Sequence, residues 1–226
     1  TVEGHMWYDV PKMILQLEIE YEDGTKEMIV SDNSWKTTTG PLLHDAIFTG
    51  EIYDARKDLG HWNRESYDDN IWESALQVRP PTGTLMFQTI PFNKVMQIVD
   101  THFEQLNDSL YIFTLPETVS GWCTLNVEGN SGDMIRLRFI SEEGLDYGQT
   151  DTYILKGGDK EEWEPKFTWH TFRKVEVVSR NTKISESSLI VKSIFTDVKN
   201  TGSFECSNEL FNRICQAYNR TMHANF

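Results

Sequence analysis

The stretch from residue 163 to 178 constrains the fold of this chain more than any other. It holds the densest group of aromatic residues in the sequence, and its second half alternates as a half-buried β-strand does. The alternation places Arg173, Val175 and Val177 on one side and Lys174 and Glu176 on the other. A run of this kind is typical of the sheet that closes a β-sandwich, and by itself it indicates no function.

Pro165 interrupts the hydrogen-bonding pattern of this stretch, because proline has no backbone N–H to donate. Residues 163–164 are therefore expected at a sheet edge or at the start of a strand. Further along, Trp169 and His170 stand side by side, and an aromatic face beside a hydrogen-bonding ring suits a sugar. The alternative is that both residues pack in the core or between domains, which is the usual place of tryptophan.

Short strands separated by turns account for most of the remaining chain. Residues 13–20 alternate apolar and polar side chains, and residues 25–30 return as a partner strand after the turn at Asp23-Gly24. Further strands are expected at residues 95–103, 110–115, 122–127, 134–140 and 189–195. In the strand at 134–140 the residues expected to face inward are Ile135, Leu137 and Phe139. The polar and proline-rich residues 80–83 indicate a domain boundary between residues 80 and 95.

Helical periodicity is confined to the C-terminal end of the chain. The apolar residues that recur at helical spacing are Leu210, Phe211, Ile214, Tyr218 and Met222. Ser207 is a suitable N-cap and Glu209 lies in the first turn, where a negative charge is favourable. The pattern predicts one amphipathic helix that ends near Asn225. Its apolar stripe needs a partner, and pairing with a second copy of the chain would create a dimer through this helix.

The predicted fold class is mainly β, with two β-sandwich domains of jelly-roll type followed by one C-terminal helix. The first sandwich is expected at residues 1–92 and the second at residues 93–199. Residues 200–226 then form a linker and the helix.

Charge and composition exclude several classes of partner. The net charge is −14, from 35 acidic and 21 basic residues, so we expect neither nucleic acid nor an anionic membrane as a partner. A neutral sugar is compatible with this surface. No apolar run is long enough to cross a bilayer. The three cysteines, Cys123, Cys206 and Cys215, lack the spacing of a zinc site or a disulfide framework and are expected to be free thiols.

No pattern in the sequence predicts catalytic residues, a metal or a cofactor. The two acidic couplets, Asp68-Asp69 and Glu142-Glu143, would point to opposite faces of an extended strand and so cannot form a facing acid–base pair. The six histidines show no metal-ligand spacing, and there is no phosphate loop, dinucleotide fingerprint or nucleophile elbow. We therefore expect no catalytic site in this chain.

Two similar local units, Asp32-x-x-Trp35 and Asp69-x-x-Trp72, occur in the first half of the chain. The expected role of each is structural, with the aspartate capping a turn and the tryptophan filling it. A sugar-facing platform is the alternative.

Several ordered motifs resemble one known family, the bacterial α-L-rhamnosidases of glycoside hydrolase family 78. Those resembling its N-terminal domain are Ser31-Asp32-Asn33-Ser34-Trp35-Lys36, Gly50-Glu51-Ile52-Tyr53-Asp54-Ala55-Arg56 and Tyr67-Asp68-Asp69-Asn70-Ile71-Trp72-Glu73-Ser74-Ala75. Those resembling the β-sandwich domain that precedes its catalytic barrel are Gly121-Trp122-Cys123-Thr124-Leu125-Asn126-Val127, Glu142-Glu143-Gly144-Leu145 and Thr150-Asp151-Thr152-Tyr153-Ile154-Leu155-Lys156-Gly157.

The resemblance implies a parent enzyme that removes terminal rhamnose from glycosides through two glutamates of an (α/α)₆ barrel. Residues 204–211 resemble the start of that barrel's first helix, and no residue of this chain matches the catalytic glutamates. The chain is then expected to be a non-catalytic N-terminal part whose partners are its own barrel and a rhamnose-containing glycan. An autonomous carbohydrate-binding module and a purely structural spacer are the alternatives. A bacterial protein of this kind can be periplasmic, secreted or cytoplasmic.

Overall fold

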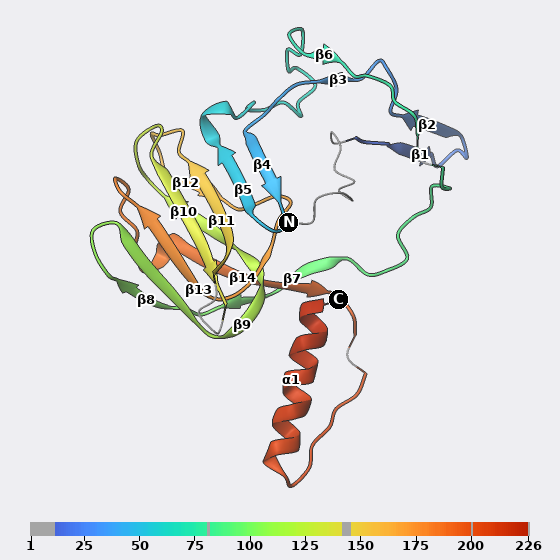
Figure 1. Ribbon diagram of the computed structural model, residues 1–226. Coiled ribbons are helices and arrows are strands. Elements are labelled where there is room, and N and C mark those ends of the chain that lie inside the picture. The colour runs from blue at the N-terminus through green and yellow to red at the C-terminus, as the bar shows by residue number, and fades with distance from the viewer. Residues whose placement is uncertain (1–11, 81, 142–145, 200, 226) are drawn as a thin grey trace, which may run out of the picture. The chain divides into compact units, whose positions relative to one another are not determined.

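The computed structural model describes residues 12–80, 82–141, 146–199 and 201–225, and strands are its main regular structure (Figure 1). The chain divides into two compact units. The small unit takes in Thr1–Thr39 and Gly60–Met86, and the large unit takes in Gly40–Leu59 and Phe87–Phe226. The prediction of a mainly β chain with one C-terminal helix is confirmed.

The small unit contains two sheets of two strands each among its described residues. Strand β1 (Gln16–Glu20) pairs antiparallel with β2 (Lys26–Val30), and β3 (Lys36–Thr37) pairs antiparallel with β6 (Glu73–Ser74). Gly24 lies between β1 and β2 with a φ of 81°, a conformation that glycine adopts without steric cost. The predicted hairpin is therefore confirmed.

The large unit is built on one ten-stranded sheet that curls into a half-barrel (Figure 1). Its strands are β4 (Leu42–Ala46), β5 (Gly50–Asp54), β7 (Asn93–Val99), β8 (His102–Gln105), β9 (Leu110–Val127), β10 (Met134–Ile140), β11 (Asp146–Ile154), β12 (Glu161–Trp163), β13 (His170–Ser179) and β14 (Leu189–Thr196). Neighbouring strands follow the order β4-β5-β11-β10-β13-β9-β14-β7, and both β8 and β12 also pair with β9. Only the pairing of β5 with β11 is parallel among these described strands. Two short 3₁₀ helices, Ala55–Lys57 and Glu186–Ser188, adjoin β5 and β14.

Strand β9 explains why the sheet curls. It is 18 residues long, and its two halves pair with different partners, β8 at one end and β12 and β14 at the other. Its ladder with β13 is irregular, because Thr114 lies opposite Lys174 whereas Val119 lies opposite Phe172. The extra residues include Pro116, which cannot donate a ladder hydrogen bond, and such irregularities bend a strand. The two strands predicted at residues 110–115 and 122–127 are thus one bent strand.

The buried core of the described chain belongs to the large unit. Alternate residues of the central strands fill it, and its largest fully buried side chains include Phe113, Leu115, Leu125, Ile135, Leu137, Phe139, Phe172 and Val175. The inward face predicted for residues 134–140 is confirmed, because alternate residues there are buried. Arg173 was predicted on the same side as Val175 and Val177, but it is not buried as they are. The irregularity between Phe172 and Lys174 breaks the alternation and leaves Arg173 half-buried, while Val175 is fully buried.

The arrangement of strands differs from the expected pair of sandwiches. Strands β4 and β5, from residues 40–59, join the sheet of the large unit, because β5 pairs with β11, which lies about one hundred residues later. The described part of the small unit forms only two-stranded sheets. The residue ranges predicted for the two domains stay a prediction.

The C-terminal helix α1 (Glu209–Asn225) begins one residue later than expected. The side chain of Asn208, rather than that of Ser207, accepts a hydrogen bond from the backbone N–H of Leu210 at 3.0 Å. Asparagine is as good an N-cap as serine, so the residue preference alone does not decide between Ser207 and Asn208. Near its C-terminal end, the ring of His223 stacks on Phe195 of β14 with ring centroids 4.3 Å apart.

Candidate functional site

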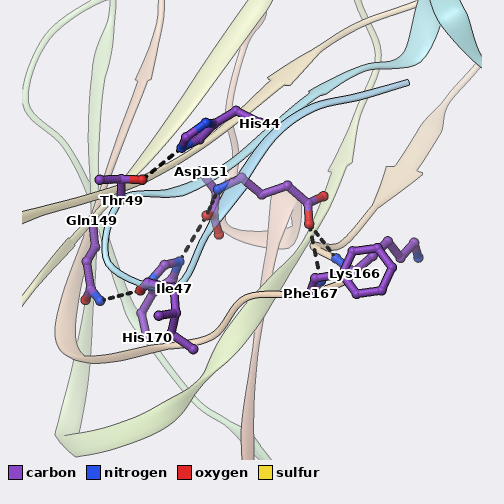
Figure 2. Close-up of polar contacts among 9 residues, drawn as sticks. His44, Ile47, Thr49, Gln149, Asp151, Lys166, Phe167 and His170 are labelled. Carbon is purple, nitrogen blue, oxygen red and sulfur yellow. Dashed lines mark hydrogen bonds and ion pairs between the residues drawn. The ribbon is translucent and has the colours of Figure 1, made fainter. Parts of the chain in front are cut away.

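The structure separates the two residues that the sequence proposed for sugar contact. The Trp169 side chain is 41% exposed, whereas His170 is only 1% exposed. The His170 ring stacks on Phe139 with centroids 4.1 Å apart, and its Nε2 lies 3.0 Å from Oδ1 of Asp151 (Figure 2). His170 therefore packs in the core. Trp169 is the member of the pair that a ligand can reach.

His170 belongs to a buried polar cluster that the sequence did not predict. It consists of Glu51 on β5, Asp151 on β11 and His170 on β13, and each of these residues is at most 1% exposed. The Oδ1 atom of Asp151 accepts the backbone N–H of Glu51 at 3.0 Å in addition to its contact with His170. One carboxylate oxygen thus joins three strands of the curled sheet.

The Glu51 carboxyl group anchors the segment that precedes β13. Its Oε2 atom accepts the backbone N–H of Lys166 at 2.8 Å and that of Phe167 at 3.4 Å. From there the chain alternates, with Phe167 and Trp169 exposed and Thr168 and His170 buried. The buried residues hold this segment on the sheet, and the two aromatic rings face outward.

The electrostatics of the cluster are unfavourable for a charged Glu51. Burial raises the pKa of Glu51, and the negative charges of Asp151 and Asp45 raise it further. The two backbone N–H groups act in the opposite direction without cancelling the shift. Among the described residues, Glu51 Oε1, Asp151 Oδ2 and His170 Nδ1 are buried without a hydrogen-bond partner.

The hairpin of β4 and β5 is tied to β11 next to this cluster. The His44 ring contacts the Thr49 hydroxyl at 2.9 Å, and the Gln149 side chain donates to the carbonyl of Ile47 at 3.1 Å (Figure 2). Gly50 has a φ of 99°, and a Cβ atom there would lie 2.3 Å from the Thr150 carbonyl oxygen. Only glycine allows this close approach of β5 to β11.

A second polar network involves Glu164, at the start of the aromatic run. Its Oε2 accepts hydrogen bonds from Trp122 Nε1 at 3.1 Å, Thr124 Oγ1 at 2.9 Å and Lys192 Nζ at 2.5 Å. Burial acts to raise the pKa of Glu164, but the hydrogen bonds from Lys192, Thr124 and Trp122 outweigh it and hold the pKa below its usual value. The strand β12 ends at Trp163, two residues before Pro165, as the edge position of that proline requires.

An aromatic cavity lies beside this network within the large unit. Its volume is about 260 Å³, and its walls include Tyr53, Tyr153 and Trp163, whose rings pack against one another with centroids 5.1–6.2 Å apart. The Tyr153 hydroxyl donates to Glu161 Oε2 at 2.8 Å. Burial, reinforced by Glu161, raises the pKa of Tyr153 well above its usual value. The three rings belong to the hydrophobic core or pack against it, so this wall of the cavity is part of the scaffold.

The acidic couplet Asp68-Asp69 does not contribute to the buried cluster. Asp68 caps a turn by accepting the backbone N–H of Asn70 at 3.1 Å, and Asp69 pairs with Lys36 Nζ at 2.6 Å. Glu142 and Glu143 lie outside the described residues. The acidic residues that do meet are Glu51 and Asp151, through the backbone N–H of Glu51 and the Asp151 carboxylate, and they are one hundred residues apart, so their proximity has no local signal in the sequence.

The first aspartate–tryptophan unit is a capped turn. Asp32 Oδ1 accepts the backbone N–H of Ser34 at 2.8 Å, and the Trp35 N–H donates to the Asp32 carbonyl at 3.2 Å. In the second unit the Trp72 N–H donates to the Asp69 carbonyl at 3.0 Å. Its side-chain cap comes from Asp68 rather than Asp69. The turn interpretation therefore accounts for both units.

The three cysteines are as the sequence predicted. Cys123, Cys206 and Cys215 are free thiols. Within the described ranges, no group of three or more His, Cys, Asp or Glu side chains has an arrangement that would hold a metal ion. No helix in the same ranges is long and apolar enough to span a bilayer.

Two models of known protein families match successive stretches of the chain. Residues 2–97 match the α-L-rhamnosidase N-terminal domain, and residues 104–195 match the bacterial α-L-rhamnosidase concanavalin-like domain. The chain thus contains two β domains of a class that is found in larger glycoside hydrolases. These are the N-terminal and concanavalin-like domains of the α-L-rhamnosidases of glycoside hydrolase family 78, the family that the sequence motifs predicted.

Individual relatives extend over almost the whole chain. An α-L-rhamnosidase of Formosa agariphila is 33% identical over 225 residues, which cover 92% of this chain and 23% of the relative. The α-L-rhamnosidase structure from Dictyoglumus thermophilum has a TM-score of 0.89 and 36% identity, and covers 97% of this chain and 26% of its own. The Streptomyces avermitilis enzyme, solved in complex with L-rhamnose, has a TM-score of 0.82 and 29% identity, over 94% of this chain and 22% of its own. The chain spans about a quarter of the length of the relatives it matches.

Proposed function

We propose that this chain is the non-catalytic N-terminal part of an α-L-rhamnosidase that hydrolyses terminal rhamnose from glycosides. The observation that carries the proposal is the succession of two rhamnosidase domains over a quarter of the length of complete relatives. The catalytic carboxylates would then lie in an (α/α)₆ barrel elsewhere in the polypeptide. The residues described here would support that barrel.

The helix α1 is the element proposed to contact the barrel. One of its faces carries Leu210, Phe211, Ile214 and Tyr218, and each of these side chains is more than half exposed. A different part of the helix is held on the large unit by the stacking of His223 on Phe195 and by Arg220, which lies 3.5 Å from Glu117. The exposed stripe is typical of a helix that packs against further helices. We propose that it forms part of the interface with the barrel.

The proposed domain arrangement in the complete enzyme has three parts. Residues 1–92 would form an N-terminal β-sandwich domain, residues 93–199 a second, concanavalin-like sandwich, and residues 200–226 a linker with the first barrel helix. The limits of the two matched domains, at residues 97 and 104, support a boundary close to the proposed one. The pairing of β5 with β11 implies that residues 40–59 contribute strands to the second sandwich.

A second candidate function is that of an autonomous carbohydrate-binding module. The observation that favours it is the exposed aromatic pair of Phe167 and Trp169, at 66% and 41% exposure. Aromatic rings of this kind bind the apolar face of a sugar. Titration of rhamnose into the chain by calorimetry, beside its Trp169→Ala variant, separates this candidate from a purely structural role.

Activity measurements on an aryl α-L-rhamnoside test the first proposal. We expect no turnover by this chain above a heat-killed control, and turnover by a longer polypeptide that includes the proposed barrel. In that longer polypeptide, Ile214→Glu would place a charge on the exposed stripe and should lower the yield of folded enzyme. Gln216→Glu, on the opposite face of α1, is the matched control and should leave the yield unchanged. Turnover by the present chain would overturn the proposal.

A further inference from the structure

The cluster of Glu51, Asp151 and His170 brings two carboxyl groups and one imidazole into the interior of the large unit. The groups that face it come from several strands. Asp45 of β4 adds a negative charge, Cys123 of β9 a buried thiol, and Phe139 of β10 an aromatic ring. Lys166 contributes its backbone amide, and its side chain lies exposed. Among the described residues, the charges that act on Glu51 are those of Asp151 and Asp45.

The cluster carries a net negative charge when both carboxyl groups are ionised. With His170 neutral it carries two negative charges, and with His170 protonated it still carries one. An uncompensated charge in a dry interior is costly, and a buried acid reduces that cost by binding a proton. In the described part of the chain, the Glu51 carboxyl group contacts backbone N–H groups and no imidazole or ammonium group, whereas Asp151 is paired with His170 at 3.0 Å.

We propose that Glu51 binds a proton when the large unit folds, and that its neutral carboxyl group holds residues 166–169 on the sheet. The carbonyl oxygen of a protonated carboxyl group still accepts the Lys166 N–H, which now lies 2.8 Å from Oε2. When Glu51 is ionised, its charge gains solvation if this segment moves away from β5. Glu51 is therefore a positioning residue for the exposed rings of Phe167 and Trp169. This inference does not depend on the proposed function.

The direction of the pH dependence follows from this arrangement. The pKa of Glu51 is raised above its ordinary value of 4.5 in the folded chain, first by burial and then by Asp151 and Asp45. The folded state therefore binds the proton more tightly than the unfolded state does. The stabilisation is fully present below pH 4.5, is lost as the pH rises through the folded pKa, and is absent above it.

Urea unfolding of the chain and its Glu51→Gln variant between pH 4.5 and 8 tests the proton uptake. Glutamine keeps a carbonyl acceptor and cannot ionise. We expect the unfolding equilibrium constant of the unmutated chain, divided by that of the variant, to rise with pH. The rise should be up to about tenfold per pH unit for one proton. The exposed Glu104 offers a matched control, and Glu104→Gln should give a ratio that does not change with pH. A constant ratio for Glu51→Gln would overturn the proposal, even if glutamine fits less well.

Acrylamide quenching of Trp169 tests the positioning role. The emission of Trp169 is isolated as the difference between each chain and the same chain carrying Trp169→Phe. We expect this emission to become more accessible as the pH rises in the unmutated chain and to stay constant in Glu51→Gln. An accessibility that does not change with pH in either chain would show that Glu51 is only structural, and would overturn its positioning role.

Discussion

The two units of this chain use hydrogen-bonded strands in different ways. In the large unit, the curled sheet buries an apolar face, and its central strands contribute rings such as Phe113 and Phe172 that are fully buried. In the described part of the small unit, by contrast, no residue is buried, and apolar side chains such as Leu17 and Met28 are about half exposed. Both units have regular strand pairing, but the buried core found among the described residues lies in the large unit.

Strand pairing and sheet stability are therefore separate properties. The β1–β2 hairpin is held by its ladder, by the turn at Gly24 and by exposed ion pairs. A two-stranded sheet with this support alone is at best marginally stable in water. The large unit gains its stability from packing, and its interior also holds polar side chains such as Glu51.

The largest effect that distinguishes the units should come from core truncation. Phe172→Ala removes a ring that is fully buried and should reduce the free energy of unfolding by about 3–5 kcal/mol. Leu17→Ala, in a side chain that is 47% exposed, should cost less than about 1 kcal/mol. Urea unfolding curves of the two variants check this difference. Equal losses would show that the small unit has as much packing as the large one.

A smaller effect should distinguish two glycines with similar backbone angles. Gly50 has a φ of 99°, and a Cβ atom there would clash with the Thr150 carbonyl and with Asp151, so Gly50→Ala should cost about 3 kcal/mol. Gly24 has a φ of 81° with open space around it, so Gly24→Ala should cost about 1 kcal/mol from backbone strain alone. Thermal or urea unfolding of the two variants measures the loss of unfolding free energy in each. If the two substitutions cost the same, close packing at Gly50 is not important for stability.

The smallest effect should come from the surface charges of the small unit. Lys26 lies 2.8 Å from Glu18 and 3.3 Å from Glu20, and all three side chains are at least half exposed. Lys26→Met should leave the unfolding curve unchanged within error, because solvent screens exposed ion pairs. The hydrogen bond from Lys26 lowers the pKa of Glu18, so an NMR titration should show that pKa rising in the variant. A hairpin that unfolds in this variant would contradict the prediction.

Much of the fold could be predicted from local patterns. The alternation of Ile135, Leu137 and Phe139 correctly indicated the buried face of β10, and the Asp23-Gly24 pair indicated the first hairpin. The stripe of the C-terminal helix was also correctly identified, with its start displaced by one residue. These features depend on neighbours two to four residues away, so a single sequence contains their cause.

The candidate site could be predicted only in part, because its members meet through non-local pairing. Trp169 and His170 are adjacent in sequence, but the sequence did not indicate that one is half exposed and the other buried. Nor did it indicate that Asp151 pairs with His170 while Glu51 holds the preceding segment. These contacts exist because β5 lies beside β11 and β11 lies beside β10, which pairs with β13.

By itself, the sequence determined the rhamnosidase family, the mainly β composition, most strand positions and the absence of recognisable catalytic motifs. Local periodicity and short ordered motifs are sufficient for these conclusions. Only the tertiary structure decided that residues 40–59 join the large sheet and that β9 is one bent strand. It also decided that Glu51 is buried, with the negative charges of Asp151 and Asp45 acting on it. The physical reason is that the burial of an acidic side chain depends on which strands pair in the sheet. Here the paired strands β5 and β11 are about one hundred residues apart in the sequence, so no local pattern predicts their pairing.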